Sequence, residues 1–87
     1  MRISYFGDAL DLSRYEYRLL KIIVESPGRI YSREQLMQKA WDEPEFSMER
    51  TVDAHIKSLR AKLRKVRPDI DPILTHRGMG YALREDW

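Results

Sequence analysis

The strongest constraint on the fold is the spacing of apolar residues between positions 49 and 66. Five large aliphatic residues recur there at steps of four, three, four and three: Val52, Ile56, Leu59, Leu63 and Val66. This spacing places all five side chains on one face of an α-helix. The pattern predicts an amphipathic helix over residues 49–66, which must bury its apolar face against the rest of the chain.

Two earlier helices are predicted from their first residues. Two serines each precede a Glu or Gln by three positions, the pattern of a capping box: Ser13 with Glu16, and Ser32 with Gln35. The first helix should stop at the Pro-Gly pair 27–28 and the second near Trp41. The residues expected to face the interior are Tyr17, Leu20, Ile23 and Val24 in the first helix and Leu36, Met37 and Ala40 in the second.

The remaining segments are predicted to be extended. Residues 2–12 alternate weakly around a Gly7-Asp8 turn signal and predict a short hairpin. Residues 29–31 predict a short strand, and residues 73–76 and 81–84 flank a turn at 77–80. This order of elements favours an α+β winged helix-turn-helix, with three helices, a short N-terminal β-hairpin and a C-terminal β-hairpin wing. A chain of 87 residues has room for one core, so residues 1–87 are predicted to form one domain.

The positive charge of the chain is concentrated in the predicted third helix. Residues 49–67 hold seven basic and two acidic residues, a net charge of +5, whereas the whole chain has a net charge of +2. This asymmetry predicts an anionic partner for the segment. Cysteine is absent, which excludes disulfides, thiolate catalysis and cysteine zinc sites. No apolar run reaches membrane-spanning length and no apolar signal segment opens the chain, so a cytosolic protein is expected.

The face opposite the apolar stripe mixes cations with small residues. At 100° per residue it carries Arg50, Ala54, Lys57, Ala61, Arg64 and Lys65, with Ser58 at its margin. Small residues let a helix backbone approach the floor of a DNA groove while the long cations reach phosphates. An ordinary solvated face is the plain alternative. Membranes and calmodulin-like proteins also bind basic helices, although this apolar stripe lacks Trp and Phe.

The segment THRGMGY, residues 75–81, uses two of the four glycines of the chain. A phosphate-binding loop needs its glycines between a strand and the start of a helix, and only seven residues, which predict a strand, follow Gly80. The two glycines are therefore predicted to shape a hairpin tip that needs positive φ angles. Arg77 at this tip is either incidental or a probe of the DNA minor groove.

Residues suited to catalysis or metal binding are scarce. His55 and His76 are the only histidines, and no spacing of His, Asp and Glu resembles a metal site. Asp42, Glu43 and Glu45 form a loop cluster that is interpreted as solvated or partner-facing. No nucleophile–base pair is recognisable, so the sequence predicts neither an enzyme nor a metal or cofactor.

Three segments together resemble a known family. They are LDLSRYEYRLLKIIVESPGRIYSREQLMQKAW, RTVDAHIKSLRAKLR and THRGMGYAL. The chain resembles, over residues 2–84, the OmpR/PhoB-type winged-helix effector domain of bacterial two-component response regulators, and CreB-type members most of all. The resemblance implies a DNA-binding output domain in the bacterial cytoplasm, here without the receiver domain that carries the phosphoacceptor aspartate.

The resemblance also implies roles for individual residues. Those expected to face base edges are Asp53, Ala54, Lys57 and Ser58. Those expected to face phosphates are Trp41, Arg50, Thr51, His55, Arg60, Arg64, Thr75 and Tyr81. Arg77 would enter the minor groove from the wing. The loop at residues 42–48, with Asp42, Glu43, Glu45 and Phe46, would meet RNA polymerase.

The chain departs from the family pattern in three places. Ser58 stands where a basic residue is common, so no base preference carries over. His76 replaces the usual aliphatic residue before the wing arginine. The N-terminal sheet has two predicted strands instead of four, which would leave a strand edge open to a homodimer through residues 2–12.

Sequence-specific binding of double-stranded DNA is the leading functional hypothesis. Helix 49–66 would enter the major groove and the wing at 75–81 the minor groove. The alternative is a winged-helix protein-interaction module without DNA specificity of its own, for example one that contacts RNA polymerase. The acidic loop and the low net charge motivate this alternative.

Overall fold

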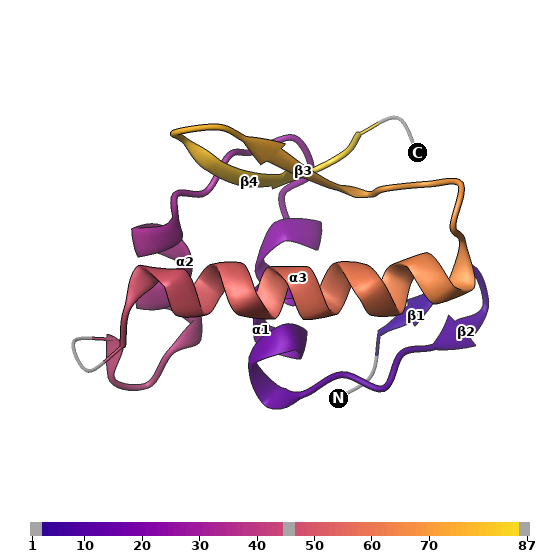
Figure 1. The fold of residues 1–87 in the computed structure, drawn as a ribbon, viewed down its shortest axis with the longest axis horizontal. Helices are drawn as coiled ribbons and strands as arrows, with labels where there is room; N and C mark the ends of the chain where they lie inside the picture. Colours follow the sequence, from indigo (N-terminus) through magenta and orange to yellow (C-terminus); the bar gives the residue numbers. More distant parts are fainter. Residues whose placement is uncertain (1–2, 45–46, 86–87) are drawn as a thin grey trace.

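The computed structural model describes residues 3–44 and 47–85. Its elements follow the order β1 (Ser4–Tyr5), β2 (Asp8–Ala9), α1 (Arg14–Val24), α2 (Arg33–Ala40), α3 (Glu49–Val66), β3 (Ile73–His76) and β4 (Gly80–Leu83). In Figure 1, α3 crosses the molecule with α1 and α2 behind it and the β3–β4 hairpin along one side. This is the predicted winged helix-turn-helix. Within the described residues, no helix is both long and apolar enough to cross a membrane.

The helix boundaries follow from local chemistry. Both predicted capping boxes are present: Ser13 pairs with Glu16 at the start of α1, and Ser32 pairs with Gln35 at the start of α2. The helix α2 ends where Trp41 takes an extended conformation. The helix α3 spans residues 49–66 as predicted, and no side chain caps its first turn.

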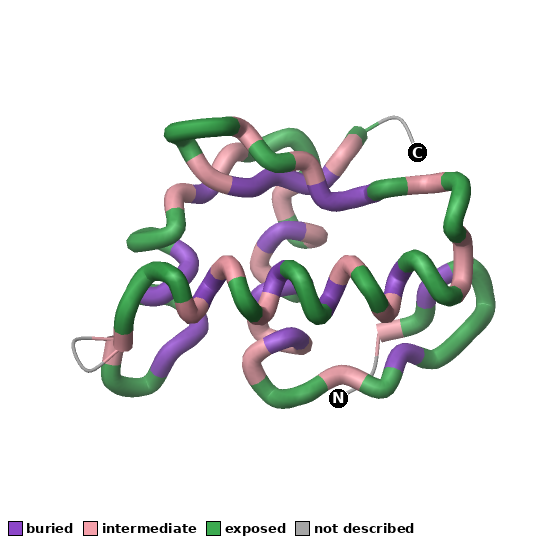
Figure 2. The backbone as a smooth tube through the Cα atoms, in the orientation of Figure 1, coloured by how far each residue is buried: buried purple, intermediate pink, exposed green. Residues whose placement is uncertain are grey.

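The core forms where the three helices meet the wing. Val52, Ile56, Leu59 and Leu63 of α3 are buried as predicted, and Figure 2 shows buried and exposed turns alternating along this helix. In α1 the prediction was partly wrong, because Tyr17 and Val24 are only half-buried. Leu19, Leu20, Ile23 and Glu16 are the buried residues of α1. The helix is therefore rotated toward Leu19, so that Tyr17 and Val24 lie at the margins of its inner face.

The wing is anchored to the segment before α2. Strands β3 and β4 pair antiparallel, with Thr75 opposite Tyr81 and His76 opposite Gly80. The strand predicted at residues 29–31 is only an isolated bridge, in which the amides and carbonyls of Tyr31 and Tyr81 exchange hydrogen bonds of 2.8 and 2.9 Å. Strand β4 begins at Gly80, one residue earlier than predicted.

The N-terminal hairpin is short and tightly turned. Strands β1 and β2 have two residues each, with Ser4 opposite Ala9 and Tyr5 opposite Asp8. The turn lies at Phe6 and Gly7, whose φ angles are 50° and 85°, rather than at the predicted Gly7-Asp8. Two consecutive positive φ angles are characteristic of a type I′ turn. The backbone twist of this turn matches the twist of strands joined by a two-residue loop.

Candidate nucleic-acid interface

The outward face of α3 is an open strip of cations and small side chains. We call it the outward strip, and it consists of Arg50, Ala54, Lys57, Ala61, Arg64 and Lys65, all of them exposed. These residues recur at helical spacing opposite the buried stripe, which is where the sequence predicted them. Because Ala54 and Ala61 are small, nothing bulky stands between the flanking cations.

The wing borders one side of the outward strip and is held to α3 by Arg60. The guanidinium of Arg60 donates to the carbonyl oxygen of Ile73 at 2.7 Å and to Oγ1 of Thr75 at 2.6 Å. It also lies over the ring of Tyr81, 5.7 Å from the centroid. Arg60 and Thr75, both predicted to face phosphates, thus contact each other in the structure, although Thr75 is itself exposed.

A second contact joins α3 to the other strand of the wing, β4. The hydroxyl of Tyr81 donates to Oδ1 of Asp53 at 2.6 Å, and Nη1 of Arg33 donates to Oδ2 at 3.0 Å. Burial and the hydrogen bond to Asp53 raise the pKa of Tyr81 to about 12. Tyr81 was predicted to face a phosphate, yet its only hydroxyl proton is directed at Asp53. Asp53 was predicted to face base edges, and both of its oxygens have partners in α2 and the wing.

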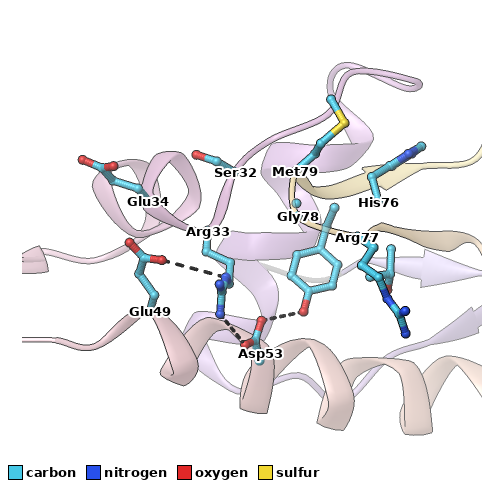
Figure 3. A pocket seen from close by; sticks show the side chains of 12 residues that line it. Ser32, Arg33, Glu34, Glu49, Asp53, His76, Arg77, Gly78 and Met79 are labelled. Atoms are coloured by element: carbon cyan, nitrogen blue, oxygen red, sulfur yellow. Dashed lines mark hydrogen bonds and ion pairs between the residues drawn. The ribbon is translucent and has the colours of Figure 1, made fainter.

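These residues line a hollow between the wing and the first turns of α2 and α3. The hollow has a volume of about 340 Å³ and is drawn in Figure 3. Glu49 lies at its edge, 3.9 Å from Nε of Arg33. Arg77 is exposed, and in Figure 3 its side chain points from the wing toward α3, whereas Met79 and His76 point away from α3. The half-buried His76 nevertheless lines the same hollow as Asp53.

An aromatic cluster borders the other side of the outward strip. Tyr15 and Trp41 stack with ring centroids 4.4 Å apart and an angle of 7° between their planes. The ring of His55 lies 5.6 Å from that of Trp41 and 5.7 Å from that of Tyr15. Trp41 and His55 were both predicted to face phosphates, and the structure brings them together on one flank. Tyr15 was missed, because its position in the first turn of α1 gives no sequence signal of contact with α3.

An ion pair between the half-buried Lys62 and the buried Glu16 anchors α3 to the start of α1. Nζ of Lys62 lies 2.5 Å from Oε1 of Glu16, whose exposed fraction is only 3%, and Lys62 also donates to the carbonyl oxygen of Asp11. Burial alone would raise the pKa of Glu16, but hydrogen bonds from Lys62, Ser58 and the Ser13 amide outweigh it and lower the pKa to about 2. Ser58, predicted to face bases, is exposed. The sequence identified Glu16 only as a capping residue. In the structure its carboxylate both caps α1 and pairs with Lys62.

The loop after α2 is tied to α1 at its first residue. The carboxylate of Asp42 accepts from Arg14 at 2.9 Å and from Arg18 at 3.1 Å, and Arg18 also donates to the carbonyl oxygen of Ala40. Glu43 is exposed. Glu45 and Phe46, which were also predicted to meet RNA polymerase, lie outside the described residues. Thr51, predicted to face a phosphate, is half-buried in the first turn of α3.

Among residues 3–44 and 47–85, no group of three His, Asp or Glu side chains is arranged to hold a metal ion. The outward strip offers exposed cations on either side of small side chains. Such an arrangement suits a polyanion with a regular backbone.

Comparison with known proteins points to one family. A family model described as "Transcriptional regulatory protein, C terminal" matches residues 7–83. The chain is similar to the transcriptional regulatory protein CreB of Escherichia coli (strain K12), with 57% identity over 83 residues that cover 95% of this chain and 36% of CreB. It is also similar to ResD of Bacillus subtilis (strain 168), with 40% identity over 81 residues that cover 92% of this chain and 34% of ResD. The chain thus spans about a third of the length of these curated relatives.

Solved structures agree with this comparison. The DNA-binding domain of CpxR from E. coli superposes with a TM-score of 0.78 at 30% identity, covering 95% of this chain and 81% of that one. The DNA-binding domain of the response regulator AdeR, solved in complex with an intercistronic region, gives a TM-score of 0.77 at 29% identity, covering 87% of this chain and 78% of that one.

Proposed function

The chain belongs to the OmpR/PhoB-type family of C-terminal domains of transcriptional regulatory proteins, and on this premise we propose that it binds double-stranded DNA sequence-specifically as the output domain of a two-component response regulator. The observation that carries the proposal is the outward strip, exposed along its whole length and bordered by the wing and the aromatic cluster. The family is a group of transcriptional regulators and not a class of enzymes. The bacterial cytoplasm, where the chromosome lies, is the compartment that we propose.

In the proposed complex, α3 lies in the major groove. Ala54 and Lys57, at the centre of the outward strip, would meet base edges, with Asp53 and Ser58 at the two margins. Small side chains permit close approach, and a lysine is a donor to guanine O6 or N7. The wing would enter the adjacent minor groove with Arg77, because a guanidinium responds to the narrow groove's negative potential.

Phosphates would be contacted on both flanks and at both ends of the outward strip. Arg50 and Arg64 lie toward its two ends, where duplex backbone passes a helix seated in the groove. Trp41, Thr51 and His55 would serve the flank of the aromatic cluster, and Arg60 and Thr75 the flank of the wing, where Asp53 already engages the hydroxyl of Tyr81. These contacts would set the register of the domain on the duplex and add no sequence information.

The test is a salt titration with a duplex selected by the protein from a random pool. With about six phosphate contacts, log K against log salt should fall with a slope of about −5. An affinity independent of salt would contradict the proposal. A lack of any gel retardation at tens of micromolar protein in low salt would instead favour a protein-interaction module without DNA specificity.

We also propose that the loop at residues 42–48 contacts RNA polymerase. The support is its acidic character and the Arg14–Asp42–Arg18 contacts, which fix the start of the loop against α1. Replacing the exposed Glu43 by Lys should abolish activated transcription while DNA affinity stays within about twofold, because one rim charge changes affinity little. An equal loss of transcription and DNA binding would contradict this role.

The whole protein is proposed to contain this domain and its own receiver domain, since the curated relatives are about three times as long. A homodimer through the short N-terminal hairpin is a further proposal, supported by the two-stranded sheet of β1 and β2. Sedimentation of the 87-residue domain at high concentration tests the homodimer. A single monomeric species would remove this proposal.

A further inference from the structure

Three elements meet at one carboxylate, that of Asp53 in the second turn of α3. Its Oδ1 accepts the hydroxyl proton of Tyr81 in β4, and its Oδ2 accepts from Nη1 of Arg33 in the first turn of α2. Figure 3 shows the side chains of Asp53 and Arg33 pointing toward each other. Asp53 thus uses both oxygens within the protein and links the recognition helix to the wing and to α2.

The position of Asp53 would be unfavourable for a residue whose only role is to contact bases. An acidic side chain beside the phosphate-facing strip would repel the duplex, whereas the adjacent guanidinium of Arg33 offsets its charge. A carboxylate with both oxygens engaged also has fewer lone pairs for a cytosine amino group. The contacts favour a structural link over direct readout at this position.

The link acts on β4, whereas the hydrogen bonds of Arg60 act on β3. Arg60 holds the wing at Ile73 and Thr75 of β3, while Asp53 holds β4 at Tyr81. Tyr81 is bonded through its own backbone to Tyr31, and it pairs with Thr75, two residues before Arg77. A shift of Tyr81 relative to α3 therefore moves the turn that carries Arg77.

We propose that Asp53 is a positioning residue, which sets the distance between α3 and the wing so that Arg77 reaches the minor groove while α3 occupies the major groove. The proposal rests on the proposed DNA-binding function. Its mechanism is preorganisation: a wing already fixed in its bound position loses less conformational entropy when the duplex binds.

A double-mutant cycle between Tyr81 and Arg77 tests the link. Tyr81→Phe keeps the ring and removes the hydroxyl, so it should weaken binding of the selected duplex about fivefold, within the range of measured pairwise couplings. In an Arg77→Ala background the same change should cost less than about twofold, because no minor-groove contact remains to be positioned. Equal losses in the two backgrounds would overturn the proposal and would mean that the Tyr81 hydroxyl contacts a phosphate directly.

Asp53→Asn provides a second variant with an independent outcome. It keeps an oxygen for Tyr81 but weakens the pairing with Arg33, so its effect should also depend on Arg77. The base preference in a pool selection should stay unchanged. A changed preference at one base pair, independent of Arg77, would overturn the proposal and restore Asp53 as a base-reading residue.

The controls separate folding, positioning and the function itself. Tyr17→Phe removes a hydroxyl from a half-buried tyrosine of α1 and should leave affinity and the coupling to Arg77 unchanged. Each variant is measured at a temperature where thermal unfolding shows it to be folded. If the unmodified domain binds no duplex, the proposed function fails. A different outcome is that the unmodified domain binds the duplex and Arg77→Ala weakens that binding by the same factor whether or not Tyr81 or Asp53 is changed. In that case only the positioning role fails.

Discussion

Glu16 is charged although its surface is almost entirely covered. Its folded pKa of about 2 lies below the ordinary value of 4.5, so ionised Glu16 stabilises the fold at neutral pH. The sign follows from linkage: the contribution is fully present above pH 4.5 and is lost as the pH falls toward 2. Glu16→Gln should lower the free energy of unfolding by about 2 kcal/mol at pH 7, since it leaves Lys62 partly buried without its counter-charge. Urea unfolding at pH 7, 5 and 3.5 measures the difference, which should be the same at pH 7 and 5 and smaller at pH 3.5.

The matched control for Glu16 is Glu25→Gln, at the exposed end of the same helix. A surface carboxylate contributes little, so this variant should change the free energy of unfolding by less than about 0.5 kcal/mol at each pH. A loss for Glu16→Gln that stays constant between pH 7 and 3.5 would show that the lost energy comes from packing and not from the charge.

The two glycines of the wing, Gly78 and Gly80, are favoured by different physical constraints. A Cβ on Gly80 would overlap the carbonyl oxygen of Tyr31, where the wing is bonded to the segment before α2, and φ there is 140°. Gly78 has a φ of 77° with open space around it. Gly80→Ala should therefore lower the free energy of unfolding by about 2–4 kcal/mol, as the backbone bridge must open. Gly78→Ala should cost only about 1 kcal/mol for its left-handed conformation. Thermal or denaturant unfolding compares the two, and equal losses would contradict the distinction.

At the scale of elements, local signals allowed much of the fold to be predicted. A capping box lies within four residues, and the apolar stripe of α3 repeats within one helix. Both predictions therefore depend on local sequence and not on tertiary packing. The rotation of α1 could not be predicted, because the burial of Leu19 rather than Tyr17 depends on packing against other elements. The strand at residues 29–31 is a single bridge, since its pairing is decided by Tyr81, fifty positions away.

The same division holds for the candidate site. The outward strip was predicted because it is the complement of a clear apolar stripe. The Asp53–Tyr81 and Lys62–Glu16 contacts join residues 28 and 46 positions apart, and no periodicity relates such pairs. Ser58 shows the consequence: it lies at the margin of the outward strip, yet it also contributes to lowering the pKa of Glu16 in α1. Residue types on one helix face are therefore predictable, whereas their hydrogen-bond partners are not.

The outward strip should lose its function when it becomes bulky without any change in charge. Ala54→Leu adds three carbons at an exposed helical position, where leucine is almost as favourable as alanine, so thermal stability should change little. DNA affinity should fall at least about tenfold, because the helix can no longer approach the groove floor. Ala9→Leu, at an exposed position of the N-terminal hairpin, is the control and should leave affinity unchanged. An unaltered affinity for Ala54→Leu would mean that α3 does not enter the groove.

For the molecule as a whole, charge placement matters more than net charge. The net charge of +2 is low for a polyanion binder, yet residues 49–67 alone carry +5. The structure arranges the exposed part of this excess along the outward strip, while Arg60, Lys62 and Arg67 bond to Thr75, Glu16 and Asp69. A duplex should therefore sense a few fixed cations near its phosphates rather than the field of the entire domain.

This distinction predicts different salt dependence for two variants of equal net charge. Arg50→Gln combined with Arg64→Gln removes two cations from the outward strip, and Lys21→Gln combined with Lys39→Gln removes two exposed cations from α1 and α2. Each phosphate contact contributes about 0.9 to the slope of log K against log salt, so the first variant should flatten the slope by about 2 and the second should leave it unchanged. Fluorescence anisotropy with one labelled duplex, at salt concentrations from about 50 to about 300 mM, measures the slope for each variant. If the two variants flattened the slope equally, the domain would bind through its diffuse charge. This result would contradict the proposal that α3 is the element that contacts the duplex.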